Sequence, residues 1–391
     1  MEGGNGSLLR VRDGHEHARV SFVELFFDLV FVFAITQLSH HLLAHLNVAG
    51  LVQTTLLFMA IWWVWIYTTW VTNWLDPERT AVRLLLFALM LAGLVLSTSI
   101  PEAFGSKGLV FAGAYVFMQV GRTLFMLWAL KDQSEGNYRN FLRITCWLVL
   151  SAVFWISGGF AQGDTRLALW VVALAVEYIS PMVRFWTPGL GASTTSDWDV
   201  EGGHLAERCG LFVIIALGES ILVTGATFGK LPWTPAVVAA FLLGFVGSVA
   251  MWWVYFNVGA ERGSKQIAGS SDPGRLARLA YTYLHLLLVA GIIVVAVGDE
   301  LVLAHPHGHT DAKTAAVLIG GPALYLLGNL LFKRISANRF ALSHQVGLGL
   351  LLLLIPAAHV LSPLVLSGAT TLVLVIVALW EARSFSSGRA A

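Results

Sequence analysis

Two carboxylates interrupt the first apolar stretch of the sequence, VELFFDLVFVFAITQLSHH at 23–41. Glu24 and Asp28 are four residues apart, so on a helix they lie on one face, one turn from each other. Two acids this close in an apolar setting need a cation, a basic partner or a shared proton. Binding or moving a proton or a cation is therefore the first chemistry that the sequence suggests.

A second polar set follows in the stretch HLAERCGLFVIIALGESIL at 204–222. His204 and Glu207 are three residues apart and share a helix face. Arg208 and Glu219 are eleven residues apart and fall nearly on one stripe. At 1.5 Å per residue, Glu219 comes about 17 Å after Arg208, near the middle of a membrane. Glu219 is therefore the leading candidate for an ion-binding or proton-binding residue.

Further polar residues lie inside apolar stretches, where an ionisable group costs about 2.5–3.5 kcal/mol. Arg122 is the one Lys or Arg that lies deep within a predicted span rather than near its ends, and we expect it to neutralise one of the carboxylates. Asn257 ends the stretch WWVYFN and is another candidate for substrate or ion binding. We expect Asp299 and Glu300, near the end of a span, to be solvated charges. The alternative for the buried polar set is a lattice of ion pairs and hydrogen bonds that only holds helices together.

Apolar helices are the elements that must position these residues. The chain has 391 residues, 57% of them hydrophobic and 12% charged, about half the charged share of a soluble protein. Long apolar runs with so little charge predict an all-α integral membrane protein, because open strands leave backbone groups unsatisfied in lipid. About twelve segments are long enough to cross a bilayer. They are 20–46, 48–73, 80–100, 108–130, 139–160, 165–185, 205–227, 233–257, 275–300, 313–332, 340–361 and 363–382.

The basic residues of the predicted loops indicate the orientation of the chain. If the N-terminus is cytoplasmic, 19 basic residues lie inside, 4 outside and 1 within a span, which accounts for all 24. This asymmetry follows the positive-inside rule, so we expect both termini in the cytoplasm.

Short matches in the same order indicate two parallel six-helix repeats. WWVW at 62–65 resembles WWVY at 252–255, and LMLAGLVL at 89–96 resembles LLVAGIIV at 287–294. The alternative is that apolar segments always look alike. Parallel repeats are one way in which transporters are built. The predicted organisation is a tail at 1–19, a first repeat at 20–186, a linker at 187–203, a second repeat at 204–384 and a tail at 385–391.

Four stretches resemble the low temperature requirement protein A family of bacterial membrane proteins. They are ELFFDLVFVFAITQLSH (24–40), TTWVTNWLD (68–76), HLAERCGLFVIIALGESIL (204–222) and WWVYFN (252–257). The resemblance implies a multi-pass protein of the bacterial cytoplasmic membrane, linked by name to growth in the cold. The family usually has Arg where Trp74 stands and Asp where Asn257 stands, so a charge-dependent role at these two positions is in doubt.

Three functions fit these patterns. The first is a secondary transporter or ion-coupled permease that uses the embedded carboxylates, with the lipid bilayer and a small molecule or ion as its partners. The second is an enzyme acting on a lipid or lipid-linked substrate, but the sequence has no recognisable nucleophile–base set. The third is a structural or sensory protein. The net charge of +1 suggests no nucleic-acid partner, and the two cysteines show no metal spacing, so we expect no metal or cofactor.

Overall fold

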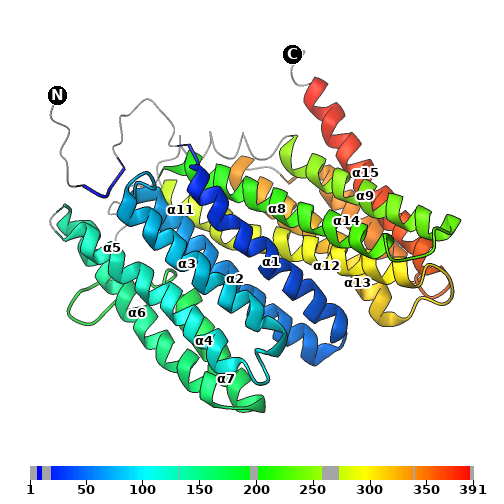
Figure 1. Cartoon of the computed structure of the whole chain (residues 1–391). Helices are drawn as coiled ribbons and strands as arrows, with labels where there is room; N and C mark the ends of the chain where they lie inside the picture. Colours follow the sequence, from blue (N-terminus) through cyan, green and yellow to red (C-terminus); the bar gives the residue numbers. More distant parts are fainter. Residues whose placement is uncertain are drawn as a thin grey trace. The chain divides into compact units, whose positions relative to one another are not determined.

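The computed structural model describes residues 7–10, 19–131, 133–193, 201–257, 273–337 and 340–387 (Figure 1). Within these ranges the regular structure is helical, and β pairing is limited to isolated bridges. The all-α prediction is therefore confirmed. Parts of the predicted tails and linker, at 1–6, 11–18, 194–200 and 388–391, lie outside the described residues.

Each of the twelve predicted segments contains a helix. The elements are α1 (Phe22–Ala44), α2 (Val48–Trp74), α3 (Thr80–Ser99), η1 (Ile100–Glu102), α4 (Gly108–Val116), the π-helix η2 (Phe117–Gly121), α5 (Arg122–Leu130), α6 (Glu135–Phe160), α7 (Gly163–Ile179), α8 (Gly202–Phe228), α9 (Pro235–Phe256), α11 (Pro273–Ala277), the π-helix η4 (Arg278–Leu284), α12 (His285–Ala304), α13 (Ala312–Ala337), α14 (Leu342–Leu354) and α15 (Pro363–Ser387).

Ten helical stretches among the described residues are long and apolar enough to cross a membrane. The chain is therefore a multi-pass membrane protein. The two predicted spans that fall short of this length are α7, with 17 residues, and α14, with 13. A bilayer needs about 20 helical residues, so these two helices leave the count of twelve as a prediction.

The chain divides into two compact units. Unit 1 comprises Met1–His41 and Val48–Leu205, and unit 2 comprises Leu42–Asn47 and Ala206–Ala391. Two compact units do not by themselves show an internal repeat, because unrelated helices can also cluster into units. The two six-helix repeats therefore stay a prediction.

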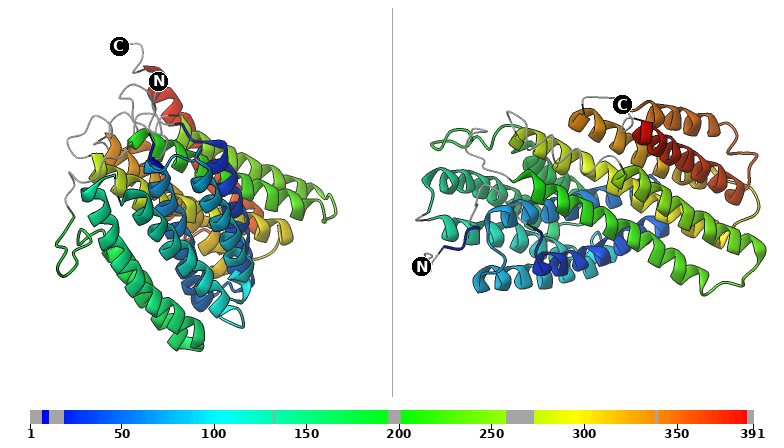
Figure 2. Two further views of the ribbon diagram at one scale, coloured as in Figure 1. Left: turned by 60° about the vertical axis from the view of Figure 1, so that its left-hand side comes forward. Right: turned by 90° about the horizontal axis from the view of Figure 1, so that it is seen from above.

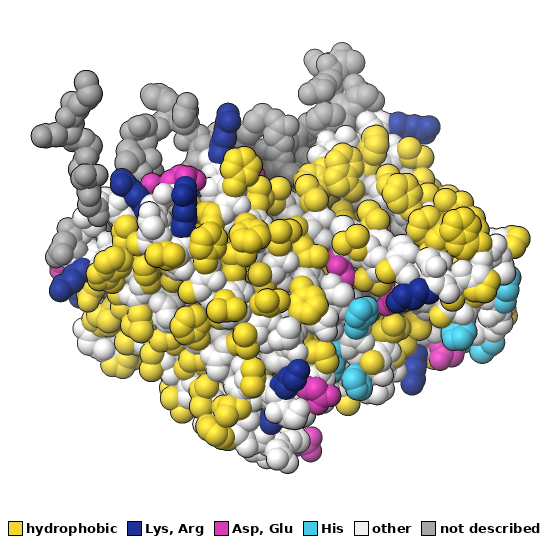
Figure 3. Space-filling view, viewed as in Figure 1, with side chains coloured by type: hydrophobic (Ala, Val, Ile, Leu, Met, Phe, Trp, Pro, Cys, Tyr) yellow, Lys and Arg dark blue, Asp and Glu magenta, His cyan; other side chains and the backbone are white. Residues whose placement is uncertain are grey.

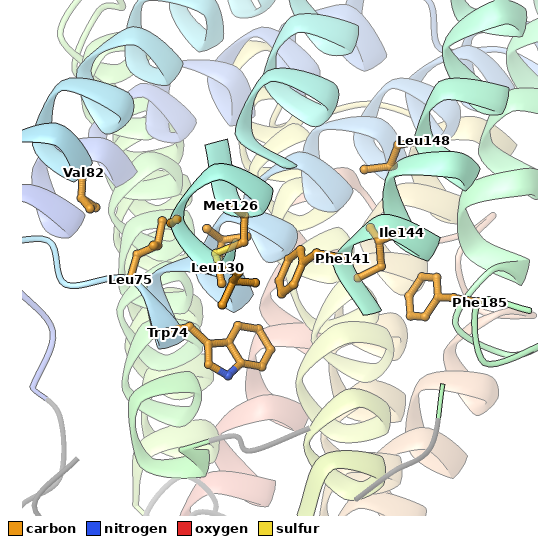
Figure 4. Packing of buried hydrophobic residues seen from close by; sticks show 11 residues of the cluster. Trp74, Leu75, Val82, Met126, Leu130, Phe141, Ile144, Leu148 and Phe185 are labelled. Atoms are coloured by element: carbon orange, nitrogen blue, oxygen red, sulfur yellow. The ribbon is translucent and has the colours of Figure 1, made fainter. Parts of the chain in front are cut away.

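Unit 1 contains a hydrophobic cluster formed by α2, α3, α5, α6 and the turn after α7. Figure 4 shows Met126 and Leu130 of α5 between Leu75 and Phe141. The rings of Trp74 and Phe141 meet edge to face, with their centroids 5.6 Å apart. This geometry is favourable for aromatic pairs and fixes the end of α2 against α6. In Figure 1, α4 and α7 lie beside α6 and complete this side of the unit.

In unit 2, α12 and α13 lie beside each other (Figure 1 and Figure 2) and approach closely through glycines. A Cβ added at Gly291 would lie 2.6 Å from the backbone nitrogen of Tyr325. One added at Gly328 would lie 3.0 Å from the backbone nitrogen of Leu288. Small residues of this kind let transmembrane helices gain van der Waals contact that lipid does not offer.

Large hydrophobic side chains are exposed on the helices of both units. Examples are Leu91, Trp128 and Leu353, with 66%, 61% and 71% of their surface exposed. Hydrophobic side chains also cover much of the face shown in Figure 3. Such exposure is expected where lipid is the solvent. Trp62 and Trp63 are instead buried, and Trp63 stacks on Tyr178, so these two tryptophans serve as packing.

Candidate functional site

Glu24 begins helix α1 as part of a capping box. The backbone N–H of Ser21 donates to Glu24 Oε2 over 2.9 Å, and the Glu24 N–H donates back to Ser21 Oγ over 3.4 Å. This reciprocal pair satisfies two backbone donors that the helix itself leaves open. The local sequence S-x-x-E therefore explains why the helix begins here, and it leaves Glu24 Oε1 for other partners.

Two basic side chains contact the carboxylate of Glu24. Arg10 Nη2 lies 3.1 Å from Oε2, and His204 Nε2 lies 2.9 Å from Oε1. Glu24 and His204 are both fully buried, although 180 residues separate them in the sequence. Arg10 also donates through Nε to the carbonyl oxygens of Thr72 and Leu75 at the end of α2. These carbonyls hold the guanidinium in place beside the acid.

Asn73 determines which nitrogen of His204 carries the proton. The Asn73 carbonyl oxygen accepts from the Glu201 N–H at 3.0 Å, which fixes the orientation of the amide. Its Nδ2 then donates to His204 Nδ1 at 3.3 Å, so Nδ1 acts as an acceptor. The other ring nitrogen, Nε2, then donates to Glu24 Oε1.

Asp28, one turn deeper in α1, is also fully buried. The indole N–H of Trp65 in α2 donates to Asp28 Oδ1 over 2.8 Å. The i,i+4 spacing placed both acids on the buried face of α1, as the sequence predicted. Glu24 contacts Arg10 and His204, whereas Asp28 accepts from Trp65, so the two acids have different partners.

A second buried network surrounds Glu177 of α7. Tyr115 and Gln119 donate to its Oε2 over 2.6 Å and 2.9 Å, and Ser151 and Trp155 donate to its Oε1 over 2.5 Å and 2.9 Å. Four donors from α4, η2 and α6 therefore satisfy both oxygens. Gln119 belongs to the π-helical turn η2, and such turns are often found at functional positions.

Arg122 joins this network through Gln119. Its Nη2 donates to Gln119 Oε1, and its Nη1 donates to Thr68 Oγ1 over 2.9 Å and to the Val64 carbonyl over 3.1 Å. The guanidinium also lies over the ring of Tyr67, 5.5 Å from its centroid. Among the described residues Arg122 forms no direct ion pair, and Gln119 lies between it and Glu177, so the expectation that it neutralises a carboxylate stays a prediction. Uncharged oxygens accept from both of its Nη atoms, whereas its Nε–H is buried without a hydrogen-bond partner among the described residues.

The candidate residues of unit 2 differ in burial. Arg208 and Glu219 of α8 are buried, whereas Glu207 is exposed. His204 and Glu207 were expected to share a helix face, but His204 is buried and Glu207 is exposed. Asn257 is half-buried at the C-terminal end of α9, where its backbone N–H donates to the Trp253 carbonyl.

The expectation of solvated charge for Asp299 is wrong. This residue is only 8% exposed, because α9 and the other helices of unit 2 enclose it laterally. Glu300 is half-buried and accepts a hydrogen bond from Thr227 over 3.0 Å. Position along a hydropathy profile gives the depth of a residue but not the helices that surround it.

Sequence reasoning missed a polar cluster at the ends of α13, α14 and α15. Lys333 Nζ lies 2.8 Å from Glu381 Oε2, and Ser343 donates to Glu381 Oε1. His344 lies beside the same carboxylate, with Nδ1 3.6 Å from Oε1. Arg10 was also missed, since it belongs to a polar stretch without periodicity. Asn73 had a signal, because it lies within the quoted motif TTWVTNWLD.

The family model described as bacterial low temperature requirement A protein (LtrA) matches residues 19–379. The chain belongs to this family. Among curated proteins, the LtrA-family chain is 43% identical over 371 residues to the Uncharacterized protein RA0937 of Rhizobium meliloti (strain 1021), covering 95% of this chain and 90% of the relative. No solved structure matches it.

The stretches whose resemblance suggested the LtrA family contribute the residues of the Glu24 site. The first contributes Glu24 and Asp28, the second Asn73 and the third His204. Three stretches that are distant in the sequence thus meet at one buried cluster of unit 1. Asn73 immediately precedes Trp74, and Trp74 packs in the hydrophobic cluster, so the position where the family usually has Arg contributes no charge here.

Proposed function

We propose that this protein is a proton-coupled secondary transporter of the bacterial cytoplasmic membrane. The proposal includes twelve spans, two parallel six-helix repeats and cytoplasmic termini. The observation that carries it is the fully buried pair of Glu24 and His204, joined at 2.9 Å. Ionisable pairs inside membrane segments are costly and typically mark proton or ion pathways.

The chemistry of this pair suits the uptake and release of one proton. Imidazole and carboxylate both change charge within the physiological range when their surroundings shift, and a hydrogen bond already connects them. Arg10 supplies a fixed positive charge on the other carboxylate oxygen. A proton added to the Glu24 carboxylate would remove its charge and so weaken the ion pair with Arg10. The contacts that hold the start of α1 to the end of α2 would then be released.

Asp28 in unit 1 and Glu219 in unit 2 are the further carboxylates that we propose to bind protons. Asp28 lies about 6 Å further along α1, at 1.5 Å per residue, and Glu219 is the buried acid of α8. In this proposal Arg122 and Arg208 balance charge, whereas Glu207 and Asn257 are candidates for contact with the transported molecule.

The test uses purified protein in liposomes with a trapped pH-sensitive dye and an inside-negative potential. Pools of amino acids, sugars, nucleosides and organic cations are added outside in turn. We expect one pool to accelerate proton entry with the natural protein. His204→Gln and Glu219→Gln should abolish this effect, whereas Glu102→Gln, a change at an exposed acid, should retain it. No response to any pool, or full coupling in Glu219→Gln, would contradict the proposal.

A further inference from the structure

A small cavity in unit 2 has a carboxylate in its wall. It has a volume of about 20 Å³ and lies where α9, α12, α13 and α15 meet. A space of this size holds one water molecule or one small ion. Its polar lining comes from Asp299 of α12 and from Ser367, Thr370 and Thr371 of α15.

Asp299 lacks a partner that its burial requires. Among the described residues, its Oδ2 is buried and has no hydrogen-bond partner, and no basic side chain pairs with the carboxylate. Gly244 of α9 makes room for it, since a Cβ there would lie 3.2 Å from Oδ2. A buried charge without compensation is strongly unfavourable, so Asp299 either holds a proton or has a positive species beside it in the cavity.

The neutral groups around the cavity are suited to ligating a cation. Thr370 donates its hydroxyl proton to the Ser367 carbonyl over 3.0 Å. The free lone pairs of this hydroxyl oxygen can therefore coordinate a cation. Pro322, inside α13, has no N–H for the carbonyl of Leu318 one turn earlier, and both residues line the cavity. Carbonyl oxygens freed from helical hydrogen bonds coordinate Na⁺ in other membrane transporters.

We propose that this cavity is a binding site for a small monovalent cation, with Na⁺ as the ion that it fits. One carboxylate balances one positive charge, whereas Ca²⁺ takes six to eight oxygen ligands and Mg²⁺ keeps several waters, for which this space is too small. Asp299 lies five residues before the end of α12, so the cavity is closer to that end of the helix than to its middle. The inference goes beyond the proposed transport function, because ion binding is measured without a gradient or a substrate.

The test is the thermal unfolding of the full chain in detergent, with Na⁺ replacing choline at constant ionic strength. A ligand that binds only the folded state raises the melting temperature in a saturable way. We expect this rise with the natural protein and no rise with Asp299→Asn. With Thr370→Val, the Na⁺ concentration that gives half of the maximal rise should be at least about tenfold higher. Asp164→Asn, at an exposed acid of unit 1, should respond like the natural protein.

Two results would overturn the site. One is an identical melting temperature in Na⁺ and choline for the natural protein, which would mean that Asp299 holds a proton. The other is an unchanged Na⁺ response in Asp299→Asn. If Asp299→Asn fails to fold, Thr370→Val decides, because an unaltered midpoint in that variant also excludes the proposed ligand set.

Discussion

Glu177 shows how a buried carboxylate is accommodated without a direct ion pair. Trp155 can only donate through its indole, and the amide Nε2 of Gln119 faces Glu177 because the amide Oε1 accepts from Arg122. The carboxylate therefore needs no proton of its own to satisfy these contacts. The Gln119 amide links Arg122 to Glu177 through two hydrogen bonds, one on each side of the amide.

Tyr115→Phe should destabilise the protein by about 1.5–3 kcal/mol, because it removes one hydrogen bond to a buried carboxylate. The measurement is the free energy of unfolding in detergent. Tyr138→Phe is the control, since Tyr138 is half-buried and forms no side-chain hydrogen bond among the described residues. Equal losses in both variants would show that the Glu177 network does not stabilise the fold.

The buried face of α1 was predictable at the level of single residues, whereas its partners were not. The i,i+4 spacing alone indicated that Glu24 and Asp28 lie together, and both are buried. Arg10 could not be assigned, because its position depends on a backbone pairing of Leu9 with Leu75 and on carbonyls at the end of α2. These are tertiary contacts that no local pattern records.

At the scale of elements, the contact between α12 and α13 depends on glycine. The Cβ positions of Gly291 and Gly321 face backbone atoms of the other helix, and backbone cannot move aside as a flexible side chain can. Their sequence stretches, LLVAGIIV and IGGPALYLLG, show the small residues but not the helix that they face. The pairing therefore could not be predicted from the sequence.

Gly291→Ala should lower stability by about 1–3 kcal/mol, because the added methyl group would force the two backbones apart. Gly320→Ala is a matched control on α13, since a Cβ there meets nothing within 4 Å. Thermal unfolding in detergent compares the two variants. A Gly291→Ala protein as stable as Gly320→Ala would mean that the helices separate without cost.

At the scale of the whole molecule, charge along the chain predicts the orientation in the membrane. Lys107 and Lys131 flank the span formed by α4, η2 and α5, and both are exposed. The positive-inside pattern assigns Lys107 to the outside and Lys131 to the cytoplasm. The helices themselves do not encode this choice, because an apolar helix crosses a bilayer equally well in either direction.

Single cysteines at these two positions test the orientation. In a Cys146→Ala background, which removes the exposed native thiol, Lys107→Cys should react with a membrane-impermeable maleimide in intact cells. Lys131→Cys should react only after the cells are permeabilised. The opposite pattern would invert the orientation of the chain and place both termini outside.

The separation of Glu24 and His204 in the sequence means that Glu24 is synthesised well before its partner. Membrane proteins enter the bilayer as they are translated, and a ribosome adds about 5–20 residues per second. The 180 residues between the two side chains therefore take about 10–40 s to make. During that time Arg10, which is translated before Glu24, is already present to compensate the acid. Arg10 would thus compensate the charge of Glu24 during membrane insertion, before His204 has been synthesised.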